Sequence, residues 1–392
     1  MATATATPSA TSKGAKQQNA QQAQAAARRP FITGSRVIDK QTYDQTRTLT
    51  TSTQRLPTYE LDTDGFTAGA YVLVDIVTAG NAATVTFAAD APYNAVDTIT
   101  FSDTSNNPIF GPMGGHDLYI AVKYGGYSFV DDQKQSPIYS TTAGAGGTGG
   151  SATFVMLVPI EIVHRDAVGA LLNKSASAVF KLDITLAANA TIYGTAPTAP
   201  GTARVRIQQY GWMDPNATDL KGNPVAQNPP ALNTVQYWDK QTYTLNAGSI
   251  AQRAQTFDGL VRNIVFELRD NTGSRTQGDA DFPDPFLMQY ETATPIQRVR
   301  AIWRHMIGQH FGYTGTADAG GGRDLGTYPE TYCRDFGLKP GAESRLGYLP
   351  VSAATALRVQ GTIGGAGSHT LTMLVNYVVP AGGDVRAIAG NR

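Results

Sequence analysis

The sequence predicts an all-β protein built from two similar domains in tandem, and three observations support this. Apolar residues recur at every second position over many short segments, turn-forming residues separate these segments, and one pattern occurs twice, 200 residues apart. The chain has 392 residues, of which 41% are apolar. This is too long for one ordinary core and sufficient for two.

The alternating segments begin at about Asp39. In Phe180–Leu186 the apolar side chains fall on one face of a strand and the polar ones on the other, and Ile264–Arg269 shows the same alternation. Shorter segments of this kind are Thr84–Phe87, Ile99–Phe101 and Val205–Ile207. Such strands between Gly, Pro, Asn and Asp are typical of an antiparallel sandwich or barrel. Tyr71–Val77 is more continuously apolar, which predicts a strand covered on both faces.

The repeated pattern opens with Asp39–Tyr43, whose sequence DKQTY recurs at Asp239–Tyr243. Each copy is followed by a polar segment and then by Asp-Gly before an apolar strand, at Asp64–Val77 and at Asp258–Leu268. Features that recur in the same order indicate a duplicated domain. A segment with four prolines and few apolar residues, 211–233, is the expected linker. The expected boundaries are an N-terminal arm at 1–38, a first domain at 39–210 and a second domain at 234–392.

Two helices are expected between strands. A short one should follow Asp166, which can cap it. Its apolar face would consist of Val168, Leu171 and Leu172. A longer one should begin at Thr294-Pro295, which provides a cap and a first-turn proline. Its apolar face would consist of Ile296, Val299, Trp303 and Met306.

The N-terminal residues 1–30 are mostly Ala, Thr and Gln and include no aromatic residue. Gln17–Arg29 has high helix propensity, but it has no apolar stripe able to dock firmly on a core. Two interpretations remain open, a disordered tail or an arm that becomes ordered only on assembly. The charged residues of the arm are all basic and give it a charge of +4: Lys13, Lys16, Arg28 and Arg29.

Charge is sparse and balanced in this chain. Charged residues make up 16% of it, and 31 basic residues match 31 acidic ones. A surface with few ions is less costly to bury against other protein, which favours an assembling protein. No net field attracts the chain to DNA or RNA, so no direct sequence-specific nucleic-acid partner is expected. Cys333 is the single cysteine, and no membrane span or secretory signal is evident, which fits folding in a reducing cytoplasm.

No catalytic, cofactor or metal site is expected. His305 and His310 are five residues apart and would not share a helical face. The glycine-rich segment 144–149 fits the dinucleotide fingerprint formally, but the strand Thr153–Val158 follows it where a helix is required, so a loop is expected. A turn with three aspartates is expected to be exposed rather than to hold an ion. Its aspartates are Asp279, Asp281 and Asp284.

With these features the sequence resembles the major capsid proteins of tailless, membrane-containing bacteriophages of the tectivirus type. The resemblance is strongest over Phe154–Leu186, where a strand ending in Val158-Pro159 precedes an expected Gly-Ala-aliphatic helix at Gly169–Asn173 and a second apolar strand. A further similarity is the basic segment Ile296–Ile307, followed by Tyr332-Cys333. The overall length is also similar. The departures from the family pattern are the glycine-rich loops 144–150 and 320–322.

The resemblance implies two tandem eight-stranded jelly-roll sandwiches with short helical excursions and an N-terminal arm. It implies a homotrimer that forms a pseudo-hexagonal block, and copies of this block that tile an icosahedral virion shell around an internal membrane. Further partners would be penton and minor capsid proteins. The arm would lie inside the shell near lipid, and assembly would take place in the host cytoplasm.

Two other functions are compatible with duplicated β sandwiches. Jelly rolls also occur in carbohydrate-binding proteins and glycan hydrolases, and the 18 tyrosines of this chain could stack on sugars. The other alternative is a trimeric receptor-binding spike, but the sequence contains a duplicated sandwich and no repetitive stalk.

Deleting residues 1–28 should leave the melting temperature of the trimer nearly unchanged and should impair particle formation. Ordering about a dozen residues costs about 1–2 kcal/mol each in backbone entropy, and four charge contacts with lipid return only about 1 kcal/mol apiece. The arm should therefore order mainly against protein, and neutralising its four cations should be milder than deletion. Thermal melting and electron microscopy check this. A deletion variant that fails to fold, or that forms membrane-containing particles normally, contradicts it.

Overall fold

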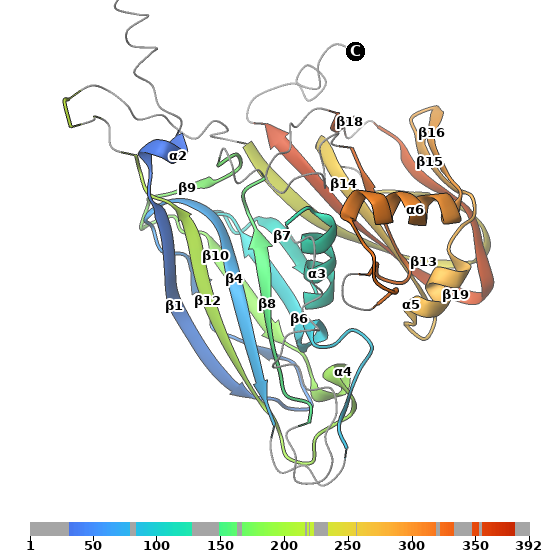
Figure 1. The fold of residues 1–392 in the computed structure, drawn as a ribbon, viewed down its shortest axis with the longest axis horizontal. Helices are drawn as coiled ribbons and strands as arrows, with labels where there is room; N and C mark the ends of the chain where they lie inside the picture. Colours follow the sequence, from blue (N-terminus) through green and yellow to red (C-terminus); the bar gives the residue numbers. More distant parts are fainter. Residues whose placement is uncertain are drawn as a thin grey trace, which may run out of the picture.

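The computed structural model describes most of the chain between Phe31 and Pro380. The described residues are 31–78, 84–127, 149–162, 167–215, 218, 220–222, 234–255, 257–318, 322–332, 347–352 and 355–380. They form two β sandwiches that lie side by side, with one helix between them (Figure 1).

The first half contains two facing antiparallel sheets. One has the order β1-β12-β4-β8, with the short β9 also paired to β4, and the other has the order β7-β6-β10, with β2 and β3 both paired to β10. Counting β2 and β3 as parts of one interrupted strand, each sheet has four main strands, which is the arrangement of a jelly roll. The strands are β1 (Val37–Thr48), β2 (Gln54–Arg55), β3 (Tyr59–Glu60), β4 (Gly65–Val77), β6 (Val96–Ser102), β7 (Pro108–Met113), β8 (Ala152–Pro159), β9 (Leu171–Asn173), β10 (Lys181–Leu186) and β12 (Thr202–Trp212), with a separate pair of β5 (Thr86–Phe87) and β11 (Tyr193–Thr195).

The second half repeats this arrangement with two long strands that serve both sheets. β14 pairs with the later part of β19, residues 369–378, and β15 pairs with its earlier part, residues 357–360. A bulge between Asn246 and Gly248 divides β13 in the same way. The two sheets therefore have the orders β13-β19-β14-β17 and β13-β19-β15-β16, which make a second jelly roll. The strands are β13 (Thr234–Arg253), β14 (Gly259–Asp270), β15 (Phe286–Tyr290), β16 (Ala293–Arg298), β17 (Thr327–Thr331), β18 (Leu349–Val351) and β19 (Leu357–Pro380).

The repeated features of the sequence occupy matching places in the two jelly rolls. The two DKQTY segments lie in β1 and β13, the first strand of each. The helix α3 (Gly115–Tyr124) begins two residues after β7 ends, and α6 (Arg300–Phe311) begins two residues after β16 ends. The shorter helices are α2 (Phe31–Gly34), η1 (Tyr93–Ala95), α4 (Asn189–Ile192) and α5 (Arg275–Asp281). The predicted tandem of eight-stranded jelly rolls is confirmed.

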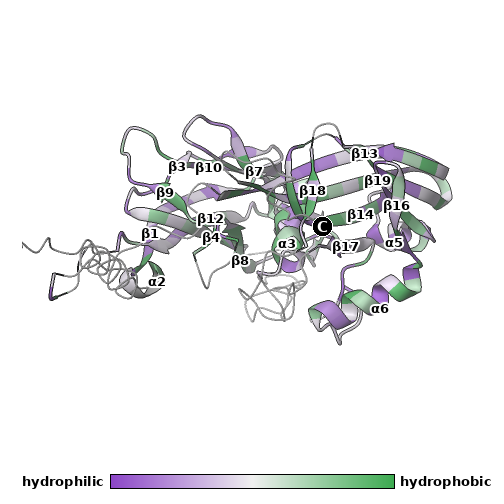
Figure 2. Cartoon of the chain, turned by 90° about the horizontal axis from the view of Figure 1, so that it is seen from above, coloured by the Kyte–Doolittle hydropathy of each residue, from purple (hydrophilic) through white to green (hydrophobic). Residues whose placement is uncertain are grey.

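One continuous core extends through both jelly rolls. The two halves meet where Phe110 of β7 pairs with Trp238 of β13, and both side chains are buried. In the second jelly roll, Trp303 of α6 packs against Phe286 with 5.0 Å between ring centres. Figure 2 shows α6 standing out from the side of this half.

Both expected helices differ from the structure. The short helix expected after Asp166 is wrong, because Leu171–Asn173 pairs with β4 as strand β9. The longer helix exists as α6, but it starts at Arg300, since Thr294 and Pro295 belong to β16, a strand that pairs with β15. Its buried face consists of Trp303, Ile307 and Phe311.

The ends of two expected segments also belong to the first jelly roll. The expected arm includes Phe31, which is buried and packs edge-on against Phe66 and Trp212 at ring-centre distances of 5.2 and 6.5 Å. The expected linker at 211–233 begins inside β12, since Trp212 pairs with Val37 of β1. The division into domains otherwise stays a prediction.

The strands β4 and β14 are counterparts, but they differ in burial. Every residue of β14 from Gly259 to Leu268 is buried, so this strand is covered on both faces. In β4 burial alternates from Tyr71 onward, and Tyr71 and Val77 are 41% and 57% exposed. The expectation that Tyr71–Val77 is covered on both faces is therefore wrong for the described part of the chain, which buries only the side toward the core fully.

Gly278 brings α5 so close to β14 that a Cβ atom there would lie 1.9 Å from the carbonyl oxygen of Leu268. Because backbone cannot yield as a side chain can, Gly278→Ala should lower the free energy of unfolding by about 1–3 kcal/mol or more. Gly308→Ala in α6 is the matched control, since its nearest contact is 3.8 Å away. The control should be neutral or stabilise by about 0.5–1 kcal/mol. Denaturant unfolding measures both, and equal effects contradict the account.

Candidate functional site at the junction of the two jelly rolls

The helix α3 lies between the two jelly rolls (Figure 1). Its first turn is closed by Asp117, whose carboxylate accepts a hydrogen bond from the Gly114 N–H at 2.9 Å. An acidic group is favourable at this end of a helix. Leu118 and Ala121 are fully buried in the shared core. The residues of α3 that bond to the second jelly roll are His116, Asp117, Lys123 and Tyr124.

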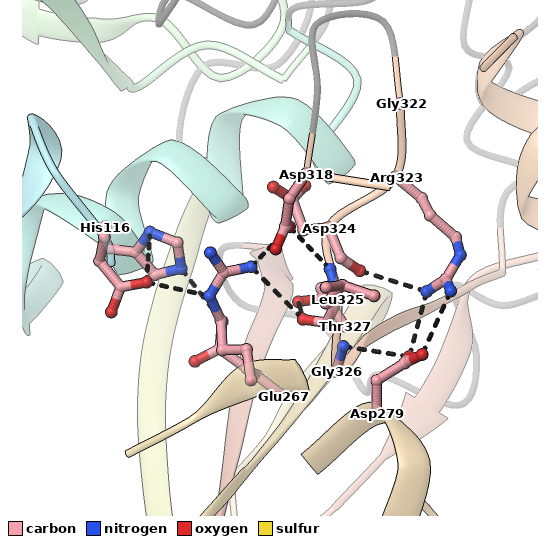
Figure 3. A network of polar contacts seen from close by, with 12 residues as sticks. His116, Glu267, Asp279, Asp318, Gly322, Arg323, Asp324, Leu325, Gly326 and Thr327 are labelled. Carbon is pink, nitrogen blue, oxygen red and sulfur yellow. Dashed lines mark hydrogen bonds and ion pairs between the residues drawn. The ribbon is translucent and has the colours of Figure 1, made fainter. Parts of the chain in front are cut away.

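A first charged cluster joins the start of α3 to β14. His116 Nε2 lies 3.2 Å from Glu267 Oε2, and both side chains are buried (Figure 3). Asp90, from the first jelly roll, accepts hydrogen bonds from Arg269 at 2.5 Å and from Arg275 at 2.9 Å. Each half therefore supplies both an acid and a base, and opposite charges face one another across the junction.

The basic neighbours keep both carboxylates of this cluster ionised. Burial alone would raise the pKa of Glu267, but Arg269 and His116 beside it hold that pKa well below its usual range. Burial also opposes ionisation of Asp90, and His116, Arg269 and Arg275 together hold its pKa below the usual value. At neutral pH the buried negative charges are thus compensated by basic groups within the junction.

A second charged cluster lies at the other end of α3. Lys123 Nζ is 2.8 Å from Asp324 Oδ2 and donates a hydrogen bond to the Gly322 carbonyl at 3.0 Å. Tyr124 donates a hydrogen bond to the same carboxylate at 3.0 Å. The Lys123 and Asp324 side chains are 9% and 5% exposed. Breaking such a buried pair costs about 3–5 kcal/mol although the intact pair adds little net stability, so its effect is to fix where α3 sits.

Two further bonds extend this junction along α3. Asn263 of β14 donates a hydrogen bond to the Tyr124 carbonyl at 2.5 Å. Lys240, in the second DKQTY segment, pairs with Asp117 at 2.6 Å. Because these contacts run from the first turn of α3 to its last, they hold the helix in one orientation against the second jelly roll.

Buried charges of this kind also occur at active sites. Here they pair across the junction, so their effect is to hold the two jelly rolls together. A cavity of about 190 Å³ beside α3 is lined mainly by tyrosine and aliphatic side chains, and it is smaller than the roughly 300 Å³ at which ligand pockets begin. Within the described ranges, no three His, Cys, Asp or Glu side chains are grouped so that they could hold a metal ion. Likewise, no helix in the described part of the chain is both long and apolar enough to cross a membrane.

The turn with three aspartates is not the exposed loop expected from the sequence. Asp279 and Asp281 are buried, because α5 packs them against basic side chains. Their partners are Arg304 and Arg323 for Asp279, His369 for Asp281 and Arg300 for Asp284. Burial opposes ionisation of Asp279, but the two arginines hold its pKa below the usual range.

Other residues singled out in the sequence stand apart from the junction. His305 and His310 both lie on α6 and make none of the ion pairs of the two charged clusters described above. Lys13, Lys16, Arg28, Arg29, residues 144–148, most of 320–322 and Cys333 lie outside the described residues. The role of the four arm cations therefore stays a prediction.

Sequence reasoning missed the junction residues. The partners His116 and Glu267 are 151 residues apart, and Tyr124 and Asp324 are 200 apart, so no local pattern connects them. The available signal was the apolar spacing of Leu118, Ala121 and Val122, which is that of a helix following a strand.

Two jelly rolls joined in this way define a double jelly-roll chain, and solved structures share the fold. The STIV MCP, from Sulfolobus Turreted Icosahedral Virus, superposes with a TM-score of 0.58 at 12% identity, over 87% of this chain and 96% of that one. The PBCV-1 virus capsid gives 0.51 at 10% identity, over 88% and 93%. The major capsid protein P2 from bacteriophage PM2 gives 0.50 at 8% identity, over 89% and 100%. No protein-family model and no curated protein matches the sequence.

Acid should destabilise the protein through the junction. Because the pKa values of Asp90 and Glu267 are lower in the folded protein than in the unfolded chain, their stabilising contribution is complete above about pH 5 and is lost as pH falls through the folded values. Glu267→Gln should lower the free energy of unfolding at pH 7 and make its decline in acid shallower. Glu60→Gln, on an exposed residue of β3, is the control and should leave stability at pH 7 unchanged. Denaturant titrations from pH 7 to pH 3 measure this, and an unaltered slope in Glu267→Gln contradicts it.

Proposed function

We propose that this chain is the major capsid protein of an icosahedral virus, a structural protein that assembles with copies of itself and is not an enzyme. The observation that carries the proposal is a pair of jelly rolls in one chain, matched over 87–89% of its length by capsid proteins of three viruses. Identities of 8–12% mean that subunit shape is what these chains share. Shape is also what a shell built from repeated units requires.

The assembled unit in this proposal is a homotrimer. Three copies of a chain with two jelly rolls give a pseudo-hexagonal block that can tile a shell. A charged fraction of 16% favours large protein contacts, because few ions must lose their water. The paired charges at the junction support the same reading, since they hold the two jelly rolls of one subunit in a fixed relation.

The finer parts of the proposal concern the other molecules that the trimer contacts and where it assembles and resides. The block would meet penton and minor capsid proteins, and the basic arm with Lys13, Lys16, Arg28 and Arg29 would face an internal membrane. Anionic lipid attracts such residues with about 1 kcal/mol each. Assembly would occur in the host cytoplasm, and the protein would then reside in the virion of a tailless bacteriophage.

Light scattering on purified protein at low micromolar concentration should give three times the 41.6 kDa mass of the chain. Negative-stain microscopy of the same material should show hexagonal blocks or shells. A mass equal to one chain across the dilution range contradicts the proposal. Specific binding on a glycan array by such a monomer would support the carbohydrate-binding alternative instead.

A further inference from the structure

The buried ion pair near the end of α3 brings together the two groups from which an amide bond is made. The Lys123 Nζ atom lies 2.8 Å from Asp324 Oδ2, and the two side chains are only 9% and 5% exposed. An amine and a carboxyl group that are held in contact away from water can condense to an amide, with loss of one water molecule. Lys123 belongs to α3 and Asp324 precedes β17, so such an amide would join the two jelly rolls covalently.

Burial distinguishes this pair from the other lysine–aspartate pairs of the described residues. In those pairs the lysine side chain is 29–48% exposed, so water stabilises both charged groups. The lysines concerned are Lys40, Lys174 and Lys240. In a dry site the charged forms lose that support, and a proton can pass from Lys123 to Asp324 along the 2.8 Å contact. This transfer leaves a neutral amine, which is a nucleophile, beside a neutral carboxylic acid.

Tyrosine side chains exclude water from this site and hold its two groups in place. Three tyrosine rings have their centres 5.1–5.8 Å from the Lys123 Nζ atom. They belong to Tyr119, Tyr124 and Tyr313. Nζ also donates hydrogen bonds to the Tyr119 hydroxyl and to the Gly322 carbonyl, both at 3.0 Å. These contacts stabilise the ion pair that precedes condensation, and they keep the amine beside Asp324.

Tyr124 is placed to supply the proton that the departing oxygen requires. Its hydroxyl donates a hydrogen bond to Asp324 Oδ2 at 3.0 Å, and the Asp324 N–H donates one to the same hydroxyl at 2.9 Å. Burial raises the pKa of Tyr124 well above its ordinary value, so the hydroxyl stays protonated at neutral pH. A donor on Oδ2 acts as a general acid, because it helps this oxygen to leave as water.

We propose that Lys123 and Asp324 join in an isopeptide bond, which forms without an added enzyme and links the two jelly rolls. Nζ of the neutral lysine attacks Cγ of the protonated Asp324, and a bond forms between these two atoms. The bond from Cγ to Oδ2 then breaks. Tyr124 gives its proton to the protonated Oδ2, which leaves as water, and takes up the proton that Nζ releases. A neutral amide replaces the charge pair, and the bond lies within one chain, so it does not depend on the proposed assembly.

Intact-mass spectrometry of the purified, folded chain tests for the bond. The mass should be lower than the sequence mass by one water, about 18 Da. Lys123→Arg keeps a positive charge beside Asp324 but removes the reacting amine, so this variant should have its full sequence mass. Lys240→Arg is the matched control, since Lys240 pairs with Asp117 at 2.6 Å in a more exposed place, and it should still lack one water.

Peptide mapping assigns the lost water, because a succinimide at Asp64-Gly65 or Asp258-Gly259 would remove the same mass. Trypsin should not cleave after Lys123, and the digest should contain one branched peptide that joins position 123 to position 324. This peptide is read from the wild-type protein, so the result does not depend on how well a variant folds. A wild-type mass equal to that of the sequence, or a lost water that maps to another position, overturns the proposal.

Discussion

The rest of the structure depends on the pairing of buried charges where α3 meets β14. Moving ionised groups such as Lys123 and Asp324 out of water is costly, and these two are tolerated because they stand 2.8 Å apart across the junction. His116 and Glu267 make a second contact across it at 3.2 Å. A shift of α3 by even part of a turn would leave several of these groups unpaired. The junction therefore permits one relation between the two sandwiches, and the subunit behaves as one body.

The same constraint explains why two similar halves differ in their outer surfaces. The second jelly roll receives α3, so the outer face of β14 carries polar and charged residues such as Asn263, Glu267 and Arg269 that match it. The outer face of β4 is partly exposed and carries Tyr71 and Val77 instead. The two halves share one architecture, and they differ in the residues on their outer surfaces because different elements pack against them.

Much of the fold could be predicted from local patterns. The alternation in Phe180–Leu186 corresponds to β10, and both Asp-Gly pairs open the apolar strands β4 and β14. The charged junction could not be predicted, because its partners are separated by roughly half the chain. The wrong prediction of a helix at Leu171–Asn173 has a similar cause. The apolar residues of this segment have the local spacing of a helix, but its pairing with β4 makes it a strand. The two-sided coverage predicted for Tyr71–Val77 is not seen among the described residues, because burial alternates along this part of β4.

The central claim is that the charged junction at α3 holds the two jelly rolls in one fixed relation, and that chains of this shape assemble with copies of themselves. A cryo-electron microscopy reconstruction of the assembled protein tests it most directly. The account predicts trimeric blocks in which six jelly rolls form a pseudo-hexagonal ring, with α3 lying on β14 within each copy. A reconstruction that shows only single chains, or copies whose two jelly rolls are separated at α3, would contradict it.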